Sequence, residues 1–275
     1  MPELPETHTI ATLLNKALAN KKISKAGVSK EYKTLPSNEV FLKTLTGRKI
    51  LSVKRIAKNI VFELDNGNFL LFHLAMTGRL LLWENKNIKE RWVRVIIYTE
   101  DGTILTFSDM RMFGKAAVLG PKQIEALKNR YGPEPLDEKT KVEEIIQKIK
   151  SKRTNIKNAL LDQNIISGIG NIYANDALFL AKIHPLTKTS DVSTDKISQL
   201  FETIKKVLTE SIDLGGATLN DKMYVDPLGN EGKYQESFKI YSKSNCPSCG
   251  TSVEFIKISG RGTYFCPSCQ KYENF

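Results

Sequence analysis

The first six residues of the chain, MPELPE, combine an amine and carboxylates that could carry out covalent chemistry. Removal of Met1 would expose the secondary amine of Pro2, and a terminal amine has an ordinary pKa of about 7.7–8.0, so part of it is unprotonated near neutral pH. Such an amine can attack a carbonyl-like carbon and form a Schiff base, and Glu3 could transfer the protons. The alternative is an ordinary helix start, with Pro5 in the first turn and Glu6 at the positive end.

Four cysteines form two Cys-Pro-Ser-Cys units near the end of the chain. Paired units of this spacing let four thiolates surround one tetrahedral zinc ion, and four protein ligands leave no open position for a substrate, so the metal is predicted to be structural. Free thiols and redox pairs are the alternatives. The predicted ligands are Cys246, Cys249, Cys266 and Cys269. Between them, residues 253–258 and 263–265 fit a β-hairpin, and Arg261 at its turn could clamp a phosphate or be an ordinary solvated arginine.

A glycine-containing turn at residues 163–171 joins two predicted helices. Gly168 and Gly170 let backbone amides approach an anion, the next helix adds its positive end, and Asn171 can donate from its side chain. Such a turn would bind a phosphate backbone without reading its sequence, although glycine turns between helices are also common without a ligand. Lys157, on the preceding helix, is a further candidate for nucleic-acid binding.

Two turns after apolar strands place large side chains where they could be exposed. Met76 and Phe113 could enter a base stack as wedges, and Arg111 could pair with an orphaned base. Met and Phe are more often core residues. The sequence alone therefore leaves both interpretations open.

Two basic residues of the same region are further candidates for contacts with DNA. Lys58 follows a predicted strand, as a phosphate ligand or an ordinary exposed lysine. His73 ends another strand and could contact DNA, although a structural, hydrogen-bonded histidine is the commoner case.

The charge balance favours a polyanionic partner. The 275 residues include 41 Lys+Arg and 30 Asp+Glu, which gives a formal net charge of +11 spread along the chain. No stretch reaches the roughly 18 consecutive apolar residues of a membrane span, and the N-terminus lacks a signal-peptide pattern. We therefore expect a soluble, intracellular protein.

The elements that must position these residues begin with an amphipathic helix at residues 5–20. Short β-rich runs separated by turn signals follow at 23–32, 49–57, 60–64, 69–74, 79–83, 93–99, 104–107 and 116–119, with short helices at 38–45 and 121–130. This pattern predicts a β-sandwich or barrel with one helix packed at its start.

The second half of the chain is helical. Residues 131–137, rich in Gly and Pro, are the predicted linker. Helices are predicted at 142–150, 155–161, 172–181 and 194–214. Residues 215–235 lack periodicity, and a loop of that length in a compact protein is usually functional or mobile.

The MPELPE start, the turn ending Ser167-Gly168-Ile169-Gly170-Asn171 and the four-cysteine terminus, in that order, resemble the Fpg/Nei family of DNA glycosylase/AP lyases. Leu4 is similar to the formamidopyrimidine branch of that family. The resemblance covers essentially the whole chain and implies an α+β multidomain fold. Its parts would be an N-terminal β-sandwich catalytic domain with a leading helix (1–130), a linker (131–137), a helix-two-turns-helix DNA-binding domain with a base-covering loop (138–235) and a β-hairpin zinc finger (236–275).

The resemblance also implies roles for individual residues. Pro2 looks like the family nucleophile, Glu3 like its acid/base partner and Lys58 like the lysine that contacts phosphate beside the lesion. The implied catalytic residues are Pro2, Glu3, Glu6 and Lys58, and the implied DNA-binding residues are His73, Met76, Arg111, Phe113, Lys157, Asn171 and Arg261.

The activity implied is that of a base-excision-repair DNA glycosylase with AP lyase activity. It would remove oxidised purines (8-oxoguanine, formamidopyrimidines) through a Schiff base at the N-terminal proline, followed by β,δ-elimination. The expected partner is damaged double-stranded DNA, bound by a monomer with one structural Zn²⁺, no nucleotide cofactor and no membrane, in the cytoplasm at the nucleoid. The alternatives are an oxidised-pyrimidine glycosylase of the same family and a non-catalytic zinc-finger DNA-binding protein.

The sequence departs from the family pattern at three places. Met110 and Met112 replace the usual proline and second arginine of one wedge turn, and Ala75 stands where glycine is common. Residues 219–233, expected to cover the everted base, do not follow the familiar pattern and look longer. The base preference is therefore open.

Overall fold

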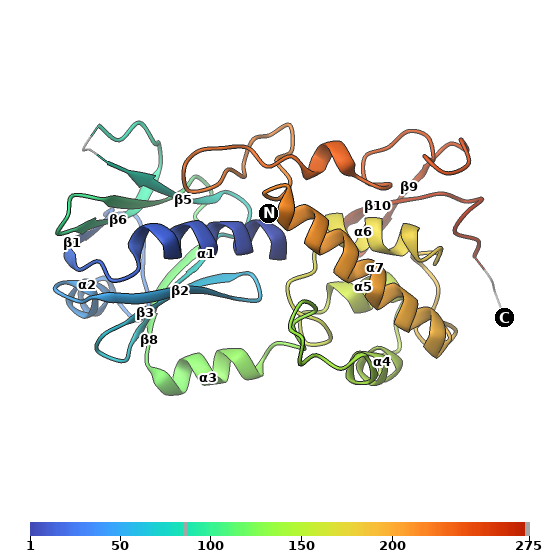
Figure 1. Ribbon diagram of the computed structural model, residues 1–275, viewed down its shortest axis with the longest axis horizontal. Helices are drawn as coiled ribbons and strands as arrows, with labels where there is room; N and C mark the ends of the chain where they lie inside the picture. Colours follow the sequence, from blue (N-terminus) through green and yellow to red (C-terminus); the bar gives the residue numbers. More distant parts are fainter. Residues whose placement is uncertain (85–86, 273–275) are drawn as a thin grey trace. The chain divides into compact units, whose positions relative to one another are not determined.

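The computed structural model describes residues 1–84 and 87–272, and the chain divides into two compact units (Figure 1). Unit 1 contains Met1–Asn129 together with Leu214–Lys233, and unit 2 contains Arg130–Asp213 together with Tyr234–Phe275. The sequence analysis groups residues 138–235 in one helical domain. The structure differs for Leu214–Lys233, because this segment hydrogen-bonds to the first helix and to a strand of unit 1.

Unit 1 begins with helix α1 (Leu4–Leu18), which starts at the second residue after Pro2. Its N-terminus is a capping box: the Glu3 side chain accepts from the backbone of Glu6, and the Glu6 side chain accepts from the backbone of Glu3. Its apolar face is buried through Leu4, Ile10, Leu14 and Leu18. The helix therefore holds the first residues of the chain on a rigid element of the core.

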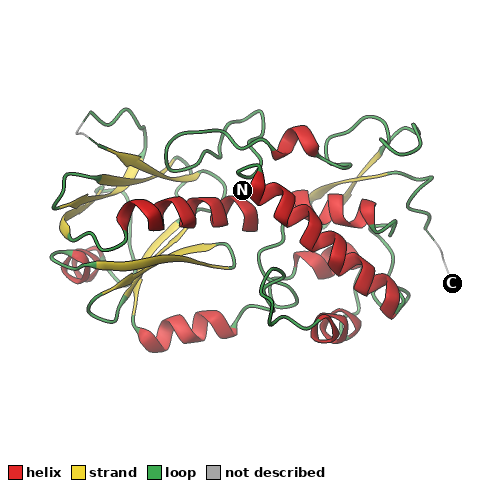
Figure 2. Ribbon diagram, in the orientation of Figure 1, coloured by secondary structure: helices red, strands yellow, loops and turns green. Residues whose placement is uncertain are grey.

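The strands of unit 1 form two four-stranded antiparallel sheets, drawn in yellow in Figure 2. One sheet has the order β1 (Ile23–Val28), β6 (Val93–Thr99), β7 (Ile104–Asp109) and β5 (Gly78–Trp83). The other has the order β2 (Ile50–Ile56), β3 (Asn59–Leu64), β4 (Phe69–His73) and β8 (Lys115–Leu119). Two separate sheets confirm the predicted β-sandwich rather than a closed barrel.

The two sheets and α1 share one hydrophobic core. Phe62, Phe72 and Phe107 are buried at its centre, with the ring centroids of Phe72 and Phe107 5.1 Å apart. Helices α2 (Asn38–Leu45) and α3 (Pro121–Asn129) pack against β1 and β8. The strands end in the turns that carry the predicted DNA-contacting residues.

Unit 2 combines four α-helices with a short hairpin among its described residues. Its elements are α4 (Val142–Lys150), α5 (Ile156–Leu161), α6 (Asn171–Leu180), α7 (Thr194–Asp213), the short 3₁₀ helix η1 (Tyr234–Ser237), β9 (Glu254–Ile258) and β10 (Arg261–Phe265). Helix α6 is buried along nearly its whole length and contacts α5, α7 and β10. It is therefore the element around which the predicted turn and the predicted finger are assembled.

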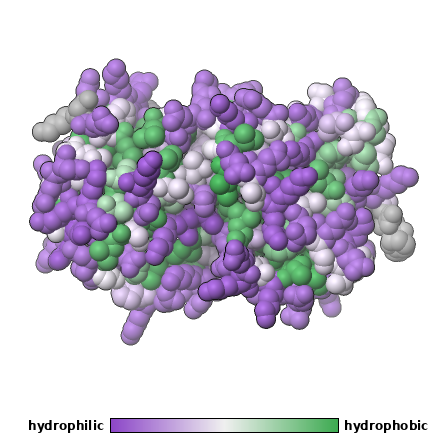
Figure 3. Space-filling model, viewed as in Figure 1, coloured by the Kyte–Doolittle hydropathy of each residue, from purple (hydrophilic) through white to green (hydrophobic). Residues whose placement is uncertain are grey.

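The exterior is mainly hydrophilic on the face drawn in Figure 3, with apolar side chains in small patches. Among the described residues, no helix has both the length and the apolar character needed to cross a bilayer. Large apolar side chains that are exposed at functional turns are therefore exceptions that need an explanation.

Candidate active site and nucleic-acid interface

The N-terminal residues form a reciprocally hydrogen-bonded group. The Glu3 amide donates to Glu6 Oε2 at 2.7 Å, and both glutamates are almost completely buried (3% and 2% exposed). Pro2 is also buried, whereas Met1 is 54% exposed. Removal of Met1 would therefore place the new terminal amine at a fixed position beside the Glu3 carboxylate.

Glu6 also fastens the segment Leu214–Lys233 to the N-terminus. Its Oε1 accepts a hydrogen bond from the Ala217 amide at 2.9 Å. Gly216 has a left-handed φ of 85°, and a Cβ at this position would lie 2.9 Å from Glu6 Cγ, so the close approach requires glycine. Tyr224 donates to Gly215 O at 2.8 Å, and burial together with the Glu6 charge raises its pKa.

Lys58 lies in the turn between β2 and β3 of unit 1, and His73 ends the neighbouring strand β4. Lys58 follows β2 and is largely buried, while His73 pairs with Asn59, the next residue after Lys58, in the β3–β4 ladder. His73 Nδ1 accepts from the Ala75 amide at 3.3 Å. Burial, followed by the charges of Lys58 and Lys115, lowers the pKa of His73. Burial and the nearby positive charges thus disfavour the imidazolium form of His73, and its Nδ1 is occupied as an acceptor.

The turn before Lys58 also contacts the start of α1. Thr7 Oγ1 donates to Glu3 O at 2.8 Å and approaches Ala57 O at 3.5 Å. Ala57 has a left-handed φ of 51°. The structure therefore brings the predicted catalytic residues Glu3 and Lys58 to the same end of the β-sandwich, through the backbone that carries each of them.

The three predicted wedge residues meet one another although they come from two turns. Arg111 Nη1 donates to Met76 Sδ at 3.6 Å, and the Arg111 guanidinium lies 4.7 Å from the centroid of the Phe113 ring. Met76 is 46% exposed and Phe113 is 56% exposed. An exposed apolar pair held by an arginine matches the chemistry of a side-chain wedge for a base stack.

The wedge turns are fixed by buried Asp109. Its carboxylate accepts from the Gly114 amide at 2.7 Å and from the Arg111 amide at 3.3 Å, and it also bonds the Thr77 hydroxyl. Ala75 and Met112, two of the departures from the family pattern, have left-handed φ values of 49° and 55°. Non-glycine residues adopt this conformation at a cost, so the surrounding hydrogen bonds hold the turns in shape.

Lys157 does not lie where the sequence analysis expects a DNA-binding side chain. It is 0% exposed, and its Nζ donates to Gly262 O at 3.1 Å and to Thr263 Oγ1 at 2.6 Å. An ammonium used in this way is not presented to a phosphate. Lys157 instead holds the β9–β10 hairpin against α5.

Asn171 meets Lys157 at the same carbonyl, because its Nδ2 donates to Gly262 O at 3.0 Å. Arg261 lies in the hairpin turn, where Ser259 and Gly260 have left-handed φ values of 48° and 75°, and its side chain is exposed. The structure thus brings Lys157, Asn171 and the turn of Arg261 together within unit 2. Of the three, Arg261 is the exposed cation.

Two polar residues of α6 were not singled out from the sequence. Asn175 Oδ1 accepts from the Tyr264 amide at 2.7 Å. Asp176, fully buried, accepts from the Ile240 and Tyr241 amides at 2.9 and 3.0 Å and from the Tyr234 hydroxyl at 3.0 Å, while burial raises its pKa. The signal was two polar residues in an otherwise apolar helix, a pattern that indicates buried partners.

The four cysteines converge as a metal site requires. Their Sγ atoms all lie within 4.8 Å of one another, with Cys246–Cys269 at 3.8 Å, Cys249–Cys266 at 3.5 Å and Cys249–Cys269 at 3.5 Å. Zn–S bonds of about 2.3 Å in a tetrahedron give S···S distances of about 3.8 Å. The cysteine positions therefore fit one structural Zn²⁺.

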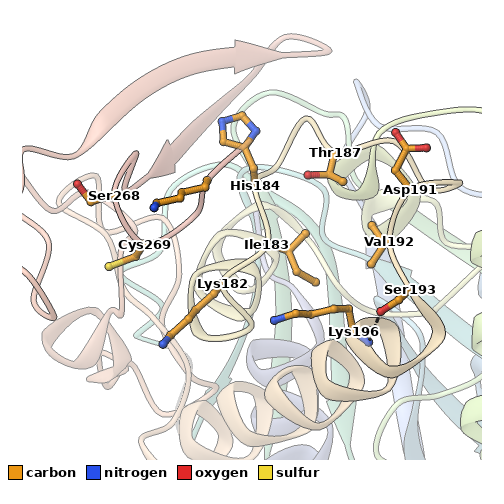
Figure 4. Close-up of a pocket in the computed structure, with 11 residues that line it drawn as sticks. Lys182, Ile183, His184, Thr187, Asp191, Val192, Ser193, Lys196, Ser268 and Cys269 are labelled. Carbon is orange, nitrogen blue, oxygen red and sulfur yellow. Dashed lines mark hydrogen bonds between the residues drawn. The ribbon is translucent and has the colours of Figure 1, made fainter. Parts of the chain in front are cut away.

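A separate hollow of about 760 Å³ lies in unit 2 beside the cysteines (Figure 4). Lys182, Lys196, His184 and Cys269 are among its lining residues. None of the predicted DNA-binding residues lines it, so it is distinct from the turn of Asn171 and Arg261.

Comparison with known proteins finds the same three regions. Residues 1–116 match the model of the formamidopyrimidine-DNA glycosylase N-terminal domain, and residues 131–223 match the formamidopyrimidine-DNA glycosylase H2TH domain. Residues 244–271 match a zinc finger found in FPG and IleRS. These matches confirm the predicted order of sandwich, helix-two-turns-helix domain and zinc finger.

Full-length relatives and solved structures point to the same family as these three domain matches. The chain is 38% identical over 275 residues to a formamidopyrimidine-DNA glycosylase of Herpetosiphon aurantiacus, covering 98% of this chain and 100% of the relative, and 37% identical to that of Listeria innocua, with the same coverage. The structure resembles Lactococcus lactis Fpg in complex with abasic-site DNA (TM-score 0.90) and with Fapy-dG DNA (TM-score 0.89), at 32% identity and 98% coverage of this chain in both cases. The chain belongs to the formamidopyrimidine-DNA glycosylase family.

Proposed function

We propose that this protein is a base-excision-repair DNA glycosylase with AP lyase activity, with Pro2 as its nucleophile. The observation that carries the proposal is the reciprocal bonding of Glu3 and Glu6 directly after the buried Pro2. A capped helix alone needs neither a proline amine at its start nor a buried carboxylate beside it. This arrangement favours an enzyme over a non-catalytic zinc-finger protein.

The proposed reaction begins when the Pro2 nitrogen attacks C1′ of an everted, damaged nucleotide. Its lone pair forms the N–C1′ bond as the bond from C1′ to the base breaks, and the departing base takes a proton from water. The Glu3 carboxylate accepts the proton that the Pro2 nitrogen then loses. Glu3 protonates the sugar ring oxygen, which opens the ring and leaves a cationic iminium. Because Glu3 is held by the helix start, this proton is delivered at a fixed position.

The iminium draws electrons from the adjacent C2′ position. Loss of a C2′ proton expels the 3′ phosphate in β-elimination, and a second proton loss expels the 5′ phosphate in δ-elimination. Hydrolysis of the remaining Schiff base frees Pro2. Pro2 supplies the nucleophile, Glu3 moves the first proton and water completes the hydrolysis, while zinc, held by four cysteines, serves the fold of the hairpin.

The proposed DNA contacts are divided between the units. In unit 1, Lys58 and His73 bind phosphate near the lesion, and Met76, Arg111 and Phe113 fill the gap left by the everted nucleotide. In unit 2, Asn171 and Arg261 bind the backbone. Lys157 acts through the hairpin rather than on DNA, because its ammonium is buried.

The proposed substrates are oxidised purines in duplex DNA, bound by a monomer that uses no nucleotide cofactor. The support is the similarity to the Lactococcus lactis protein, whose structures contain abasic-site and Fapy-dG DNA. Residues 219–233 differ from the family pattern, so an oxidised-pyrimidine preference is the alternative that must be tested.

The test is a panel of duplexes containing 8-oxoguanine, formamidopyrimidine, thymine glycol or an abasic site, each incubated with the protein and borohydride. We expect covalent adducts with the abasic and oxidised-purine duplexes, and weaker adducts with thymine glycol. Faster reaction with thymine glycol would replace the purine assignment by the pyrimidine one. The absence of any adduct across the panel would refute the glycosylase/AP lyase proposal.

A further inference from the structure

The segment Leu214–Lys233 is tied to unit 1 at two separate places. At its base, Ala217 bonds Glu6, and Ala217 also pairs with Lys233 in an antiparallel bridge. Within the segment, Thr218 Oγ1 donates to Tyr224 O at 2.9 Å and accepts from the Gly232 amide at 2.9 Å. These bonds close the base of the segment into a loop. The residues between Thr218 and Gly232, called the tip below, must be held by other contacts.

Arg79, on β5, provides the contact at the tip. Its Nε donates to Met223 O at 3.1 Å, and its Nη2 donates to Lys222 O. Further along the segment, the Leu82 amide of the same strand donates to Pro227 O at 2.8 Å. One guanidinium thus binds two consecutive carbonyls, which fixes both the position and the orientation of this peptide.

Arg79 uses its guanidinium to bind backbone carbonyls rather than a carboxylate. No acidic side chain among the described residues forms an ion pair with it, so its two described hydrogen bonds both go to the segment. The nearest ion pair of the tip is internal, between Lys222 Nζ and Glu231 Oε1 at 2.7 Å. Arg79 therefore supplies the side-chain attachment of the tip to β5, beside the backbone hydrogen bond from Leu82 to Pro227.

The attachment point lies beside the proposed wedge turns. A hollow of about 310 Å³ in unit 1 is lined by Arg79 and Met223, by Thr77 beside the wedge, and by Arg91 and Met110 among others. The base of the same segment bonds Glu6, which bonds the residue next to Pro2. The position of the tip consequently sets the width of the space between the wedge turn and the segment.

We propose that Arg79 is a positioning residue for base excision: by holding the Lys222 and Met223 carbonyls, it keeps the segment in the conformation that accepts a damaged base. The inference rests on the proposed function. The inference distinguishes base excision from the lyase reaction at an abasic site, because an abasic site presents no base to the segment. Loss of Arg79 should slow excision of a base and spare the reaction of Pro2 with an abasic site.

The experiment compares the full-length wild type with Arg79→Ala, Arg79→Lys and Arg91→Ala. Arg91 lines the same hollow and has no hydrogen bond to the segment among the described residues, so its replacement controls for the loss of one positive charge. Each protein is tested in single turnover on 8-oxoguanine DNA and by borohydride trapping on abasic DNA. Hydrogen exchange of the amides of residues 219–230 is measured without DNA.

We expect Arg79→Ala to slow base excision about tenfold while abasic trapping changes less than about twofold, the range for loss of charged hydrogen bonds that act in one step. Arg79→Lys, which keeps the charge but cannot bind both carbonyls with a planar fork, should be intermediate. Exchange at residues 219–230 should speed up in both variants, and Arg91→Ala should match the wild type throughout.

Three results would overturn the inference. They are equal losses on lesion and abasic DNA in both Arg79 variants, an equal loss of excision in Arg91→Ala, and unchanged amide exchange in the Arg79 variants. If Arg79→Ala does not fold, Arg79→Lys decides the matter by the same criteria. Failure of the proposed function would show instead as the absence of trapping by the wild type, and the exchange measurement would still test the attachment of the tip.

Discussion

The start of α1 and the hairpin turn of unit 2 use buried polar groups in opposite ways. At the start of α1, the proposed reactive groups themselves are buried, with Glu3 and Glu6 bonded to each other's backbone. At the hairpin turn, the buried Lys157 and the half-buried Asn171 bind one carbonyl, and Arg261, the proposed DNA contact, is exposed. Burial and hydrogen-bond partners, rather than residue type, therefore distinguish the proposed reactive residues, the residues that support the fold and the residues proposed to contact DNA.

The largest expected effect comes from blocking the terminal amine. A variant that keeps Met1 and carries Gly-Ser before Pro2 should lose borohydride trapping by at least ~10³-fold, because the covalent route is closed. DNA binding should remain, since unit 2 is unchanged. The same two residues added at the C-terminus serve as the control. Trapping by the N-terminally extended protein would show that another amine is the nucleophile.

Removal of a zinc ligand should be the next largest change. Cys249→Ala should lower the zinc content from one equivalent towards none and open the hairpin, because structural zinc supplies about 10–16 kcal/mol of binding free energy in finger peptides. Salt-sensitive DNA binding should weaken strongly, while the near-UV signal of unit 1 persists. Ser248→Ala, in the same Cys-Pro-Ser-Cys unit, is the matched control. Full DNA affinity without zinc would refute a structural role for the metal.

The wedge should matter for activity without mattering for stability. Phe113 is 56% exposed, so Phe113→Ala should change the free energy of unfolding by less than about 0.5 kcal/mol, as for most surface substitutions. Lesion excision should fall roughly tenfold, because the gap left by the everted nucleotide is no longer filled. Leu51→Ala, an exposed leucine on β2, is the control. Equal excision by Phe113→Ala and the control would remove Phe113 from the wedge.

The two cations of the hairpin region should behave differently. Arg261→Ala should reduce the slope of log affinity against log salt by about one, without a change in thermal stability. Lys157→Met should cost about 1–3 kcal/mol of stability, because Thr263 and Gly262 lose a buried charged donor. Thermal unfolding and salt titrations measure both. If Lys157→Met lowered only the salt slope, Lys157 would be a direct phosphate ligand after all.

The smallest expected effect is a pH dependence at His73. Burial and the charges of Lys58 and Lys115 hold its folded-state pKa below 6.5, so the unfolded chain binds this proton more readily. The contribution of His73 to stability is therefore constant above pH 6.5 and falls as the pH drops towards the folded pKa, by at most about 1.4 kcal/mol per pH unit.

His73→Asn tests this sign, because the amide oxygen of asparagine can accept from the Ala75 amide without titrating in this range. Urea unfolding at pH 7.5, 6.5 and 5.5 should show a smaller loss of stability at low pH in His73→Asn than in the wild type. A steeper loss in the variant would mean that His73 is charged in the folded protein.

The sandwich, α1 and the four-cysteine hairpin could be predicted from local patterns. Alternating apolar residues define strands, and the Cys-x-x-Cys spacing defines the metal ligands, so neighbouring residues carry the information. Boundaries were less accurate: the strand predicted at 23–32 ends at Val28, because the Tyr32 amide bonds Ser29 O in a turn.

The features that could not be predicted from the sequence depend on hydrogen-bond partners far away along the chain. Lys157 is separated by 105 residues from Gly262, the carbonyl that its ammonium binds, and nothing near Lys157 reveals that it is buried. The attachment of Arg79 to Met223 spans 144 residues. The segment Leu214–Lys233 likewise has no periodicity that would assign it to unit 1, because hydrogen bonds with the Glu6 side chain and with β5 hold it there.

The hydrogen bond between Glu6 and Ala217 also bears on how the protein is made. It joins residues 211 positions apart, so the N-terminal residues leave the ribosome long before the segment that fastens onto them. At roughly 5–20 residues per second, synthesis of the intervening chain takes on the order of 10–40 seconds. The segment that carries the proposed nucleophile is therefore made early and receives this hydrogen bond late. A nascent chain halted before residue 217 would have the strands of the sandwich without the segment that bonds Glu6.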